Sequence, residues 1–215
     1  MDIIISDTHI ARDFDSKKYS FLHDLFSKAN RIIINGDFLD MYFCAIDDIK
    51  KSKWMGLLDI IKKKNAVIVL GNHDSLIRKF YSQYSKTVLD QYDCRLAGKK
   101  FTIIHGHQIV PNLSEKYQFL KRFPLIYTLG KYRNKFSWMI FKMKGQMRYQ
   151  KLNEKMKLWK ALHLKKAEYL ITSHTHYPEY DKNARFLNTG FIDYGFASYI
   201  KIDNNEISLV QITYG

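Results

Sequence analysis

Short apolar runs alternate with longer amphipathic segments along much of this 215-residue chain. The runs are rich in β-branched residues and only three to four residues long, which is typical of strands buried on both faces. The segments between them repeat apolar residues at helical spacing, as Leu22, Leu25 and Phe26 do. The pattern predicts strands at 3–5, 32–34, 67–70, 101–104 and 169–172, and helices at 16–29 and 54–64.

The last thirty residues are rich in strand signals. Further strands are predicted at 185–187, 197–202 and 207–213, with Asp203-Asn204-Asn205 as a hairpin turn between the last two. Strands that alternate with helices and then follow one another predict an α/β fold with two packed sheets flanked by helices. Since no Gly/Ser linker, repeat or low-complexity tract interrupts the sequence, we expect one domain over residues 1–215.

A polar cluster follows each of the first five predicted strands. Open α/β sheets bind ligands at the carboxyl ends of their strands, so we expect these clusters to share one edge. They hold six of the eight histidines, and carboxylates mixed with imidazoles are suitable ligands for a pair of divalent cations. The five clusters are Asp7-Thr8-His9, Gly36-Asp37-Phe38-Leu39-Asp40, Gly71-Asn72-His73-Asp74, His105-Gly106-His107 and His174-Thr175-His176.

In number, order and residue type, the clusters resemble the five motifs of the calcineurin-like metallophosphoesterase family. The resemblance implies a two-sheet metallophosphoesterase sandwich that hydrolyses phosphoester or diphosphate bonds with two divalent metal ions. Mn²⁺ is the expected metal, with Fe, Zn, Mg and Ni as alternatives. Motif by motif, it assigns one ion to Asp7, His9 and His176, the other to Asn72, His105 and His174, and a bridging position to Asp37.

The same resemblance implies roles for the residues around the ligands. His73 matches the catalytic histidine that stabilises or protonates the leaving oxygen, and Asp74 is expected to orient its ring. Asp40 and His107 are expected to lie beside the ligands without binding metal themselves. The last motif usually begins with Gly, whereas this chain has Ser173 there. Because that position contributes backbone, we expect metal binding to persist.

Nearly all of the net charge of +14 is concentrated between the fourth and fifth clusters. Residues 111–166 hold fifteen Lys and Arg against two Glu, together with ten aromatic residues. Leu152, Met156, Trp159 and Leu162 fall at helical spacing, so 151–166 is predicted to be a helix packed on the body. From 113 to 148, apolar clusters alternate with basic residues. This composition favours a lipid-facing helical cap over a purely structural one, with single-stranded nucleic acid as the third alternative.

A basic, aromatic insertion at this place resembles the UDP-2,3-diacylglucosamine diphosphatase branch of the family. The resemblance implies an anionic, nucleotide-linked glycolipid as substrate and contact with an anionic membrane. Candidate residues for holding the rest of such a substrate are Arg78, Lys144 and Arg148. Some members of the branch have Arg where this chain has His73, and many have Asp where it has His107. Both departures bear on the substrate more than on the chemistry.

No stretch approaches the roughly 20 apolar residues of a transmembrane helix. Cys44 and Cys94 form no closely spaced pair, and the N-terminus runs directly into the first strand. We therefore expect a cytoplasmic protein, or one peripheral to the inner membrane face. Three alternatives remain open: a nuclease or nucleotide phosphodiesterase, a protein phosphatase, and a scaffold that binds no metal. The protein phosphatase is disfavoured because the Asp37 motif lacks the Arg that follows it in that branch.

Overall fold

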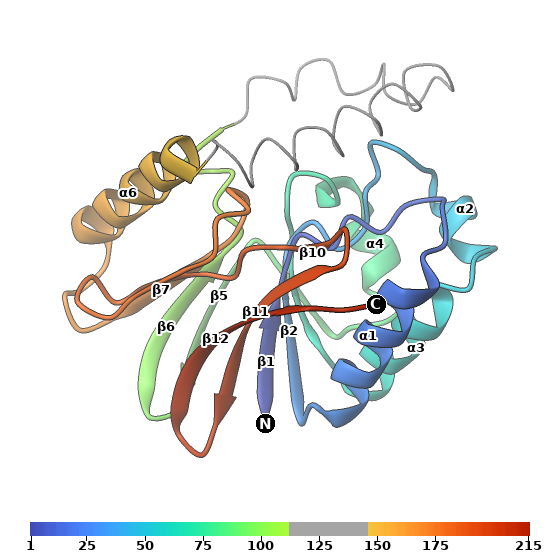
Figure 1. The fold of residues 1–215 in the computed structure, drawn as a ribbon, viewed down its shortest axis with the longest axis horizontal. Helices are drawn as coiled ribbons and strands as arrows, with labels where there is room; N and C mark the ends of the chain where they lie inside the picture. Colours follow the sequence, from blue (N-terminus) through green and yellow to red (C-terminus); the bar gives the residue numbers. More distant parts are fainter. Residues whose placement is uncertain (112–145) are drawn as a thin grey trace.

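The computed structural model describes residues 1–111 and 146–215, which form two mixed β-sheets with helices on their outer faces (Figure 1). In the larger sheet, four neighbouring strands are parallel, and three C-terminal strands continue the sheet in antiparallel pairs. The strands are β1 (Asp2–Ile5), β2 (Arg31–Asn35), β3 (Val67–Val69) and β4 (Thr87–Leu89), followed by β10 (Ile192–Asp193), β11 (Phe196–Asp203) and β12 (Glu206–Thr213).

The smaller sheet has a parallel centre and antiparallel edges. Its order is β5 (Gln91–Leu96), β6 (Lys99–Ile104), β7 (Tyr169–Thr172), β9 (Phe186–Asn188) and β8 (Glu179–Asp181). Strands β6, β7 and β9 run parallel, whereas β5 and β8 pair antiparallel at the two ends. The α/β fold with two sheets predicted from the sequence is therefore confirmed.

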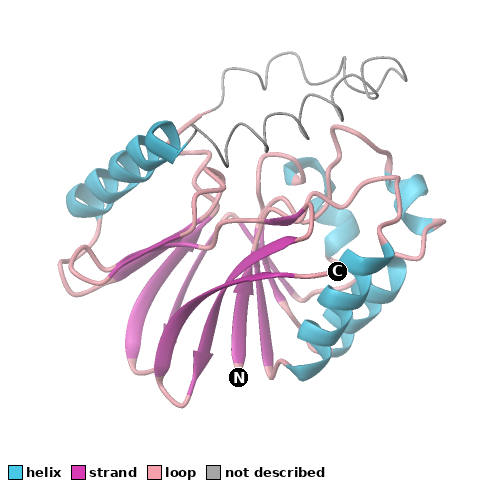
Figure 2. Cartoon of the chain, in the orientation of Figure 1, coloured by secondary structure: helices cyan, strands magenta, loops and turns pink. Residues whose placement is uncertain are grey.

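Helices cover the outer faces of both sheets (Figure 2). Those beside the larger sheet are α1 (Ser16–Lys28), α2 (Ile46–Lys50), α3 (Met55–Lys63), the 3₁₀ turn η1 (Ser75–Ile77) and α4 (Arg78–Tyr81), and α6 (Gln146–His163) covers the smaller one. Period-two side-chain alternation explains the layers. Ile3 and Ile5 pack under α1 and α3, whereas Ile4 points into the core between the sheets. The strands that bury apolar residues on both faces are those that the short apolar runs of the sequence predicted.

The predicted helices agree with the structure to within a few residues. The carboxylate of Asp15 caps α1 by accepting hydrogen bonds from the amides of Lys17 and Lys18, both at 3.0 Å. The hairpin between β11 and β12 turns through Asn204 and Asn205, which both have positive φ, as a two-residue type I′ turn requires.

The helix predicted at 151–166 begins five residues earlier and ends three residues earlier. The face that it buries also differs from the prediction, because Asn153, Met156 and Lys160 are buried while Leu162 is 72% exposed. The apolar clusters and Lys144 of the insertion lie outside the described residues. Among the helices of the described part, none is long and apolar enough to cross a membrane.

Candidate metal centre

All five polar clusters lie at the carboxyl ends of their strands, as predicted. Asp7, Asp37 and Asn72 follow β1, β2 and β3 of the larger sheet, and His105 and His174 follow β6 and β7 of the smaller one. Hydrogen bonds tie the loops together. The amide of His73 donates to Asp37 Oδ1 at 2.8 Å, and the amide of His174 donates to Asp7 Oδ2 at 3.2 Å. The edge shared by the two sheets is therefore where the sequence motifs meet.

The backbone of these loops adopts a conformation that most residues avoid. Five of the seven predicted ligands have φ between 43° and 66°, in the left-handed region, where a side chain costs free energy. Such residues persist only where the surrounding structure holds them, and they cluster at functional sites. The five are Asp7, His9, Asp37, His174 and His176.

Two glycines allow three of the loops to approach one another. A Cβ atom on Gly36 would lie 2.3 Å from His105 Nδ1, and one on Gly71 would lie 2.1 Å from Asp37 Oδ1. Both separations are far inside van der Waals contact. Only glycine therefore lets the loops after β2, β3 and β6 close around the Asp37 carboxylate.

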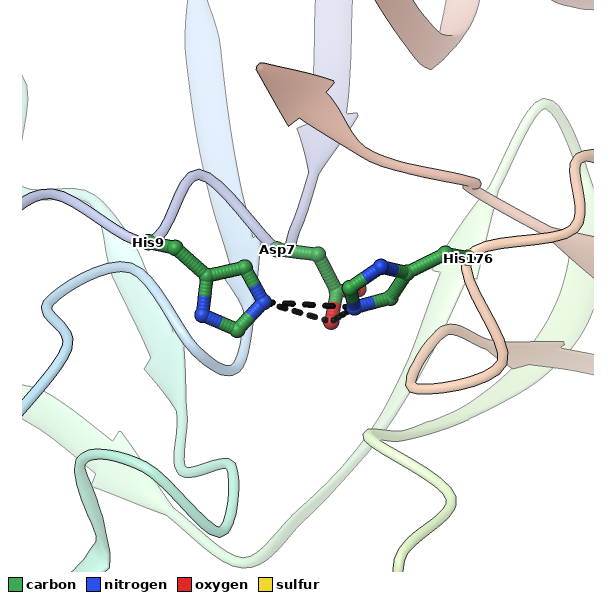
Figure 3. Close-up of side chains that lie close together, drawn as sticks. All are labelled: Asp7, His9 and His176. Atoms are coloured by element: carbon green, nitrogen blue, oxygen red, sulfur yellow. Dashed lines mark hydrogen bonds and ion pairs between the residues drawn. The ribbon is translucent and has the colours of Figure 1, made fainter. Parts of the chain in front are cut away.

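Asp7, His9 and His176 form the first His/Asp cluster (Figure 3). Asp7 Oδ1 lies 3.1 Å from His176 Nε2 and 3.7 Å from His9 Nε2, and the two imidazole nitrogens are 3.2 Å apart. Three ligand atoms that point at a common centre match the ligand set predicted for one metal ion. They come from the loops after β1 and β7, and His9 and His176 are 167 residues apart in the sequence.

Asp37 belongs to two further clusters, one with His105 and His174 and one with His9 and His73. Its Oδ2 atom lies 3.2 Å from His105 Nε2 and 3.8 Å from His73 Nε2. Asp37 is almost completely buried between these histidines. Asp37 therefore lies within reach of His9, a predicted ligand of the first ion, and of His105 and His174, predicted ligands of the second, which is the arrangement expected of a bridging ligand.

The donor atoms fit divalent metal ions. Among the described residues, the buried ligand atom Asn72 Oδ1 has no hydrogen-bond partner, and Asp7 Oδ1 and His105 Nε2 face only the ligand atoms His176 Nε2 and Asp37 Oδ2, at 3.1 and 3.2 Å, without hydrogen-bond geometry. Unpartnered polar atoms are costly in a protein interior, and a cation would satisfy all three. His105 Nδ1 lies 2.8 Å from the carbonyl of Asn35, a contact that leaves Nε2 for a metal. Mixed nitrogen and oxygen ligands suit first-row transition metals.

The electrostatics of the cluster also reflect a site built for cations. Burial would raise the pKa of Asp7, but the neighbouring His176 and His105 lower it to about 2. The pKa of Asp37 is likewise held well below its usual value, against the effect of burial, by His105 and His73. Although burial opposes it, Asp37 and Asp7 raise the pKa of His105 to about 10. Two buried carboxylates thus require positive charge, which metal ions can supply in place of the protons.

The partner of His73 differs from the predicted one. Asp40 Oδ1 lies 2.8 Å from His73 Nδ1, and Asp40 Oδ2 lies 3.5 Å from His9 Nδ1. The buried carboxylate of Asp74 instead accepts hydrogen bonds from the amides of Gly71 and Phe38 and from the hydroxyl of Tyr81 at 2.8–3.0 Å. The prediction that Asp74 orients His73 is therefore wrong, because the Asp74 side chain points into the fold.

The remaining candidates have varied surroundings. Arg78 is held on both sides, with Nη2 2.7 Å from each carboxylate oxygen of Asp90 and Nη1 2.6 Å from the carbonyl of Val88, which favours a structural role. Arg148 belongs to α6, but its side chain is not among the described parts of the structure. Lys144 lies outside the described residues. The His107 ring is centred 5.5 Å from that of His105, beside the ligands as expected, and burial and His105 lower its pKa to about 4.

Some residues that build the site were not identified from the sequence. The buried hydroxyl of Ser173, placed where Gly was expected, lies 2.8 Å from both the Asn35 carbonyl and His105 Nδ1. Lys18 of α1 is buried and donates to the carbonyl of Thr8 and, at 2.9 Å, to Asp193 Oδ1. Asn153 of α6 binds Thr175. The one available signal was that Asn153 stands three residues before Met156, on the same helix face.

Comparison with solved structures agrees with the fold. The solved structure of Yfce, a phosphoesterase from E. coli, is 15% identical over 100% of this chain and 99% of that one, with a TM-score of 0.52. Protein TM1076 from Thermotoga maritima is 17% identical over 99% and 98%, with a TM-score of 0.50. At these identities the likeness supports the fold. No curated protein sequence matches the chain.

The family model described as calcineurin-like phosphoesterase matches residues 3–200, which include all five motifs. The chain belongs to the calcineurin-like phosphoesterase family, which confirms the sequence-based prediction of a metal-dependent phosphoesterase.

Proposed function

We propose that this protein hydrolyses a phosphodiester or diphosphate bond with two Mn²⁺ ions held at the shared sheet edge. The observation that carries the proposal is the position of Asp37, which lies in one cluster with His105 and His174 and in another with His9. Asp7, His9 and His176 would hold one ion, and Asn72, His105 and His174 the other, with Asp37 shared between them. When bound there, the ions would supply Lewis-acid charge for the phosphoryl oxygens and acidify a water molecule.

His73 is the group that handles the leaving oxygen in this proposal. Its Nδ1 faces the Asp40 carboxylate at 2.8 Å, so that Nε2 is directed toward the cluster, 3.8 Å from Asp37 Oδ2. The water loses one proton to solvent and adds to phosphorus as hydroxide, the bond from phosphorus to the leaving oxygen breaks, and His73 Nε2 gives that oxygen its proton. The charge of Asp40 stabilises the imidazolium form that this transfer requires.

The proposed substrate is a nucleotide-linked glycolipid of the UDP-2,3-diacylglucosamine type, an anionic molecule carried on a membrane surface. The support is compositional: residues 111–166 combine fifteen basic residues with ten aromatic ones, which suits a lipid with a charged head group. Nucleic acid is the alternative partner, because the same basic residues can bind phosphates along a strand. Lys144 and Arg148 remain proposed contacts to the substrate.

Hydrolysis assays with the Mn²⁺-loaded protein distinguish these possibilities. We expect turnover of UDP-2,3-diacylglucosamine and slower turnover of bis-p-nitrophenyl phosphate, with both activities removed by a chelator and restored by Mn²⁺. Cleavage of single-stranded DNA without cleavage of the glycolipid would replace the substrate proposal. Absence of hydrolysis on all three compounds, in protein that holds two ions, would overturn the catalytic proposal.

A further inference from the structure

Helix α6, the described part of the insertion, contacts two of the loops that carry the predicted ligands. Met156 is fully buried against Ile104, Leu170 and Phe186 on the outer face of the smaller sheet. Its Cε atom would lie 2.6 Å from a Cβ atom on Gly106. The helix therefore packs directly on the turn between His105 and His107, at a glycine whose φ of 113° other residues rarely adopt.

Asn153, one turn earlier on α6, contacts the second loop. It has no exposed surface, and all four of its side-chain hydrogen-bonding positions are used. Its Oδ1 accepts from Thr175 Oγ1 at 2.8 Å and from Asn188 Nδ2 at 3.1 Å. Its Nδ2 donates to the carbonyl of Tyr177 at 3.1 Å and to Glu179 Oε2 at 2.8 Å.

Thr175 is the residue between His174 and His176, one predicted ligand of each metal ion. Both histidines have left-handed backbone, which costs free energy unless the neighbouring structure fixes it. Thr175 Oγ1 also accepts a hydrogen bond from Asn188 Nδ2 at 3.0 Å. Thr175, which links the two ligands, is only 2% exposed. Asn153 and Asn188 thus fix its side chain by hydrogen bonds.

We propose that Asn153 is a positioning residue for the metal centre, which acts through Thr175 on the placement of His174 and His176. Helix α6 of the insertion would then influence metal affinity as well as lie beside the metal centre. The inference rests on the proposed function for its two metal ions, and it extends that function to a residue of the insertion. Residues that support ligands from behind typically change metal affinity by about 10–100-fold when they are replaced.

The test is calorimetric titration of metal-free protein with Mn²⁺, together with thermal unfolding of the same metal-free samples. We expect Asn153→Leu to raise the Mn²⁺ dissociation constant by about 10-fold or more. Thr175→Val should have a similar or larger effect, because it removes the hydroxyl that contacts both Asn153 and Asn188, and Thr175→Ser should restore tight binding. If Asn153 acts through Thr175, the double variant should bind no more weakly than Thr175→Val alone.

Lys157→Met is the matched control on the same helix. Lys157 Nζ pairs with Asp181 at 3.0 Å and with Glu179 at 2.5 Å, so it ties α6 to the sheet. It shares Glu179 with Asn153 but leaves the contact of Asn153 with Thr175 in place. This variant should lower the unfolding temperature and leave Mn²⁺ affinity unchanged. Folded Asn153→Leu and Thr175→Val variants that bind two ions with wild-type affinity would overturn this inference alone. Wild-type protein that binds no Mn²⁺ would overturn the proposed function together with it.

Discussion

His73 and Asp74 are neighbours in the chain, yet their side chains have different partners. His73 faces Asp40 and the metal ligands, whereas Asp74 is buried beneath them among backbone amides. Burial and the charge of Asp37 raise the pKa of Asp74 to about 6, despite its hydrogen bonds from Gly71 and Tyr81. The carboxylates of Asp40 and Asp74 therefore have distinct surroundings, one beside His73 and one inside the fold.

Substitutions at these positions should separate catalysis from stability. His73→Ala should lower kcat by about 10²–10⁴-fold with bound metal retained, the usual range for a general acid. Asp40→Asn should lower kcat less, because its amide oxygen can still accept from His73.

Asp74→Asn should instead destabilise the fold by about 1–3 kcal/mol, because one of the groups that donate to the Asp74 carboxylate loses its acceptor. Steady-state kinetics, metal analysis and denaturant unfolding measure the three quantities. Loss of metal in His73→Ala would make His73 a ligand.

Gly71 sets how closely Asp37 can approach the loop after β3. In Gly71→Ala, the added Cβ would lie 2.1 Å from Asp37 Oδ1, so the carboxylate must move. We expect Mn²⁺ affinity to fall by about 10-fold or more, by analogy with other changes behind metal ligands. Gly98→Asn is the control, because a Cβ atom there meets nothing within 4 Å and Asn tolerates its left-handed φ of 70°. Equal Mn²⁺ affinity in the two variants would contradict the steric account.

At the scale of elements, the sequence was enough to predict the strands and the polar cluster that follows each one. It was not enough to predict the direction of every side chain. The five metal motifs and the strands before them were predictable because buried parallel strands and their polar ends leave strong local patterns. Short elements such as α2 and β8 were not, since their few residues include charged ones and form no buried apolar run. The contact of Asn153 with Thr175 could not be predicted either, because it joins residues 22 positions apart through tertiary packing.

The buried face of α6 shows the same limit. The spacing of apolar residues predicted that Leu162 packs against the rest of the domain, but the helix buries Asn153 and Lys160 instead. The polar requirements of the loop beneath Asn153 decide the rotation of the helix there, and they outweigh the burial of one leucine. Leu158 and Leu162 remain 62% and 72% exposed.

The apolar clusters of the insertion allow a test of the substrate proposal. Polar substitutions at Trp138, Ile140 and Phe141 should reduce hydrolysis of the lipid-bearing substrate and spare that of bis-p-nitrophenyl phosphate, because the metal loops lie outside the insertion. Under the nucleic-acid alternative, neutralising Arg122 and Lys131 should instead weaken DNA binding and reduce its salt slope by about 0.7 for each phosphate that is no longer neutralised. Sedimentation with anionic liposomes, compared with a DNA titration, measures the two outcomes. An equal decrease in hydrolysis of the small and the lipid substrate would contradict a lipid-facing role.

At the scale of the whole molecule, the metal centre depends on both sheets. The larger sheet supplies Asp7, Asp37 and Asn72, and the smaller one supplies His105 and His174. The sheets meet through an apolar core that includes Ile4, Ile103 and Ile200. The complete set of predicted ligands therefore comes together only in the packed domain, and metal binding should add to its stability.

The most direct test of the central claim is to count Mn²⁺ ions per chain and to measure phosphodiester hydrolysis in the same sample. Wild-type protein should bind two ions, and activity should appear as the second site fills. Asp37→Ala should bind fewer ions and lose turnover while remaining folded. Near-wild-type activity in Asp37→Ala, or full activity with a single bound ion, would contradict the two-metal account.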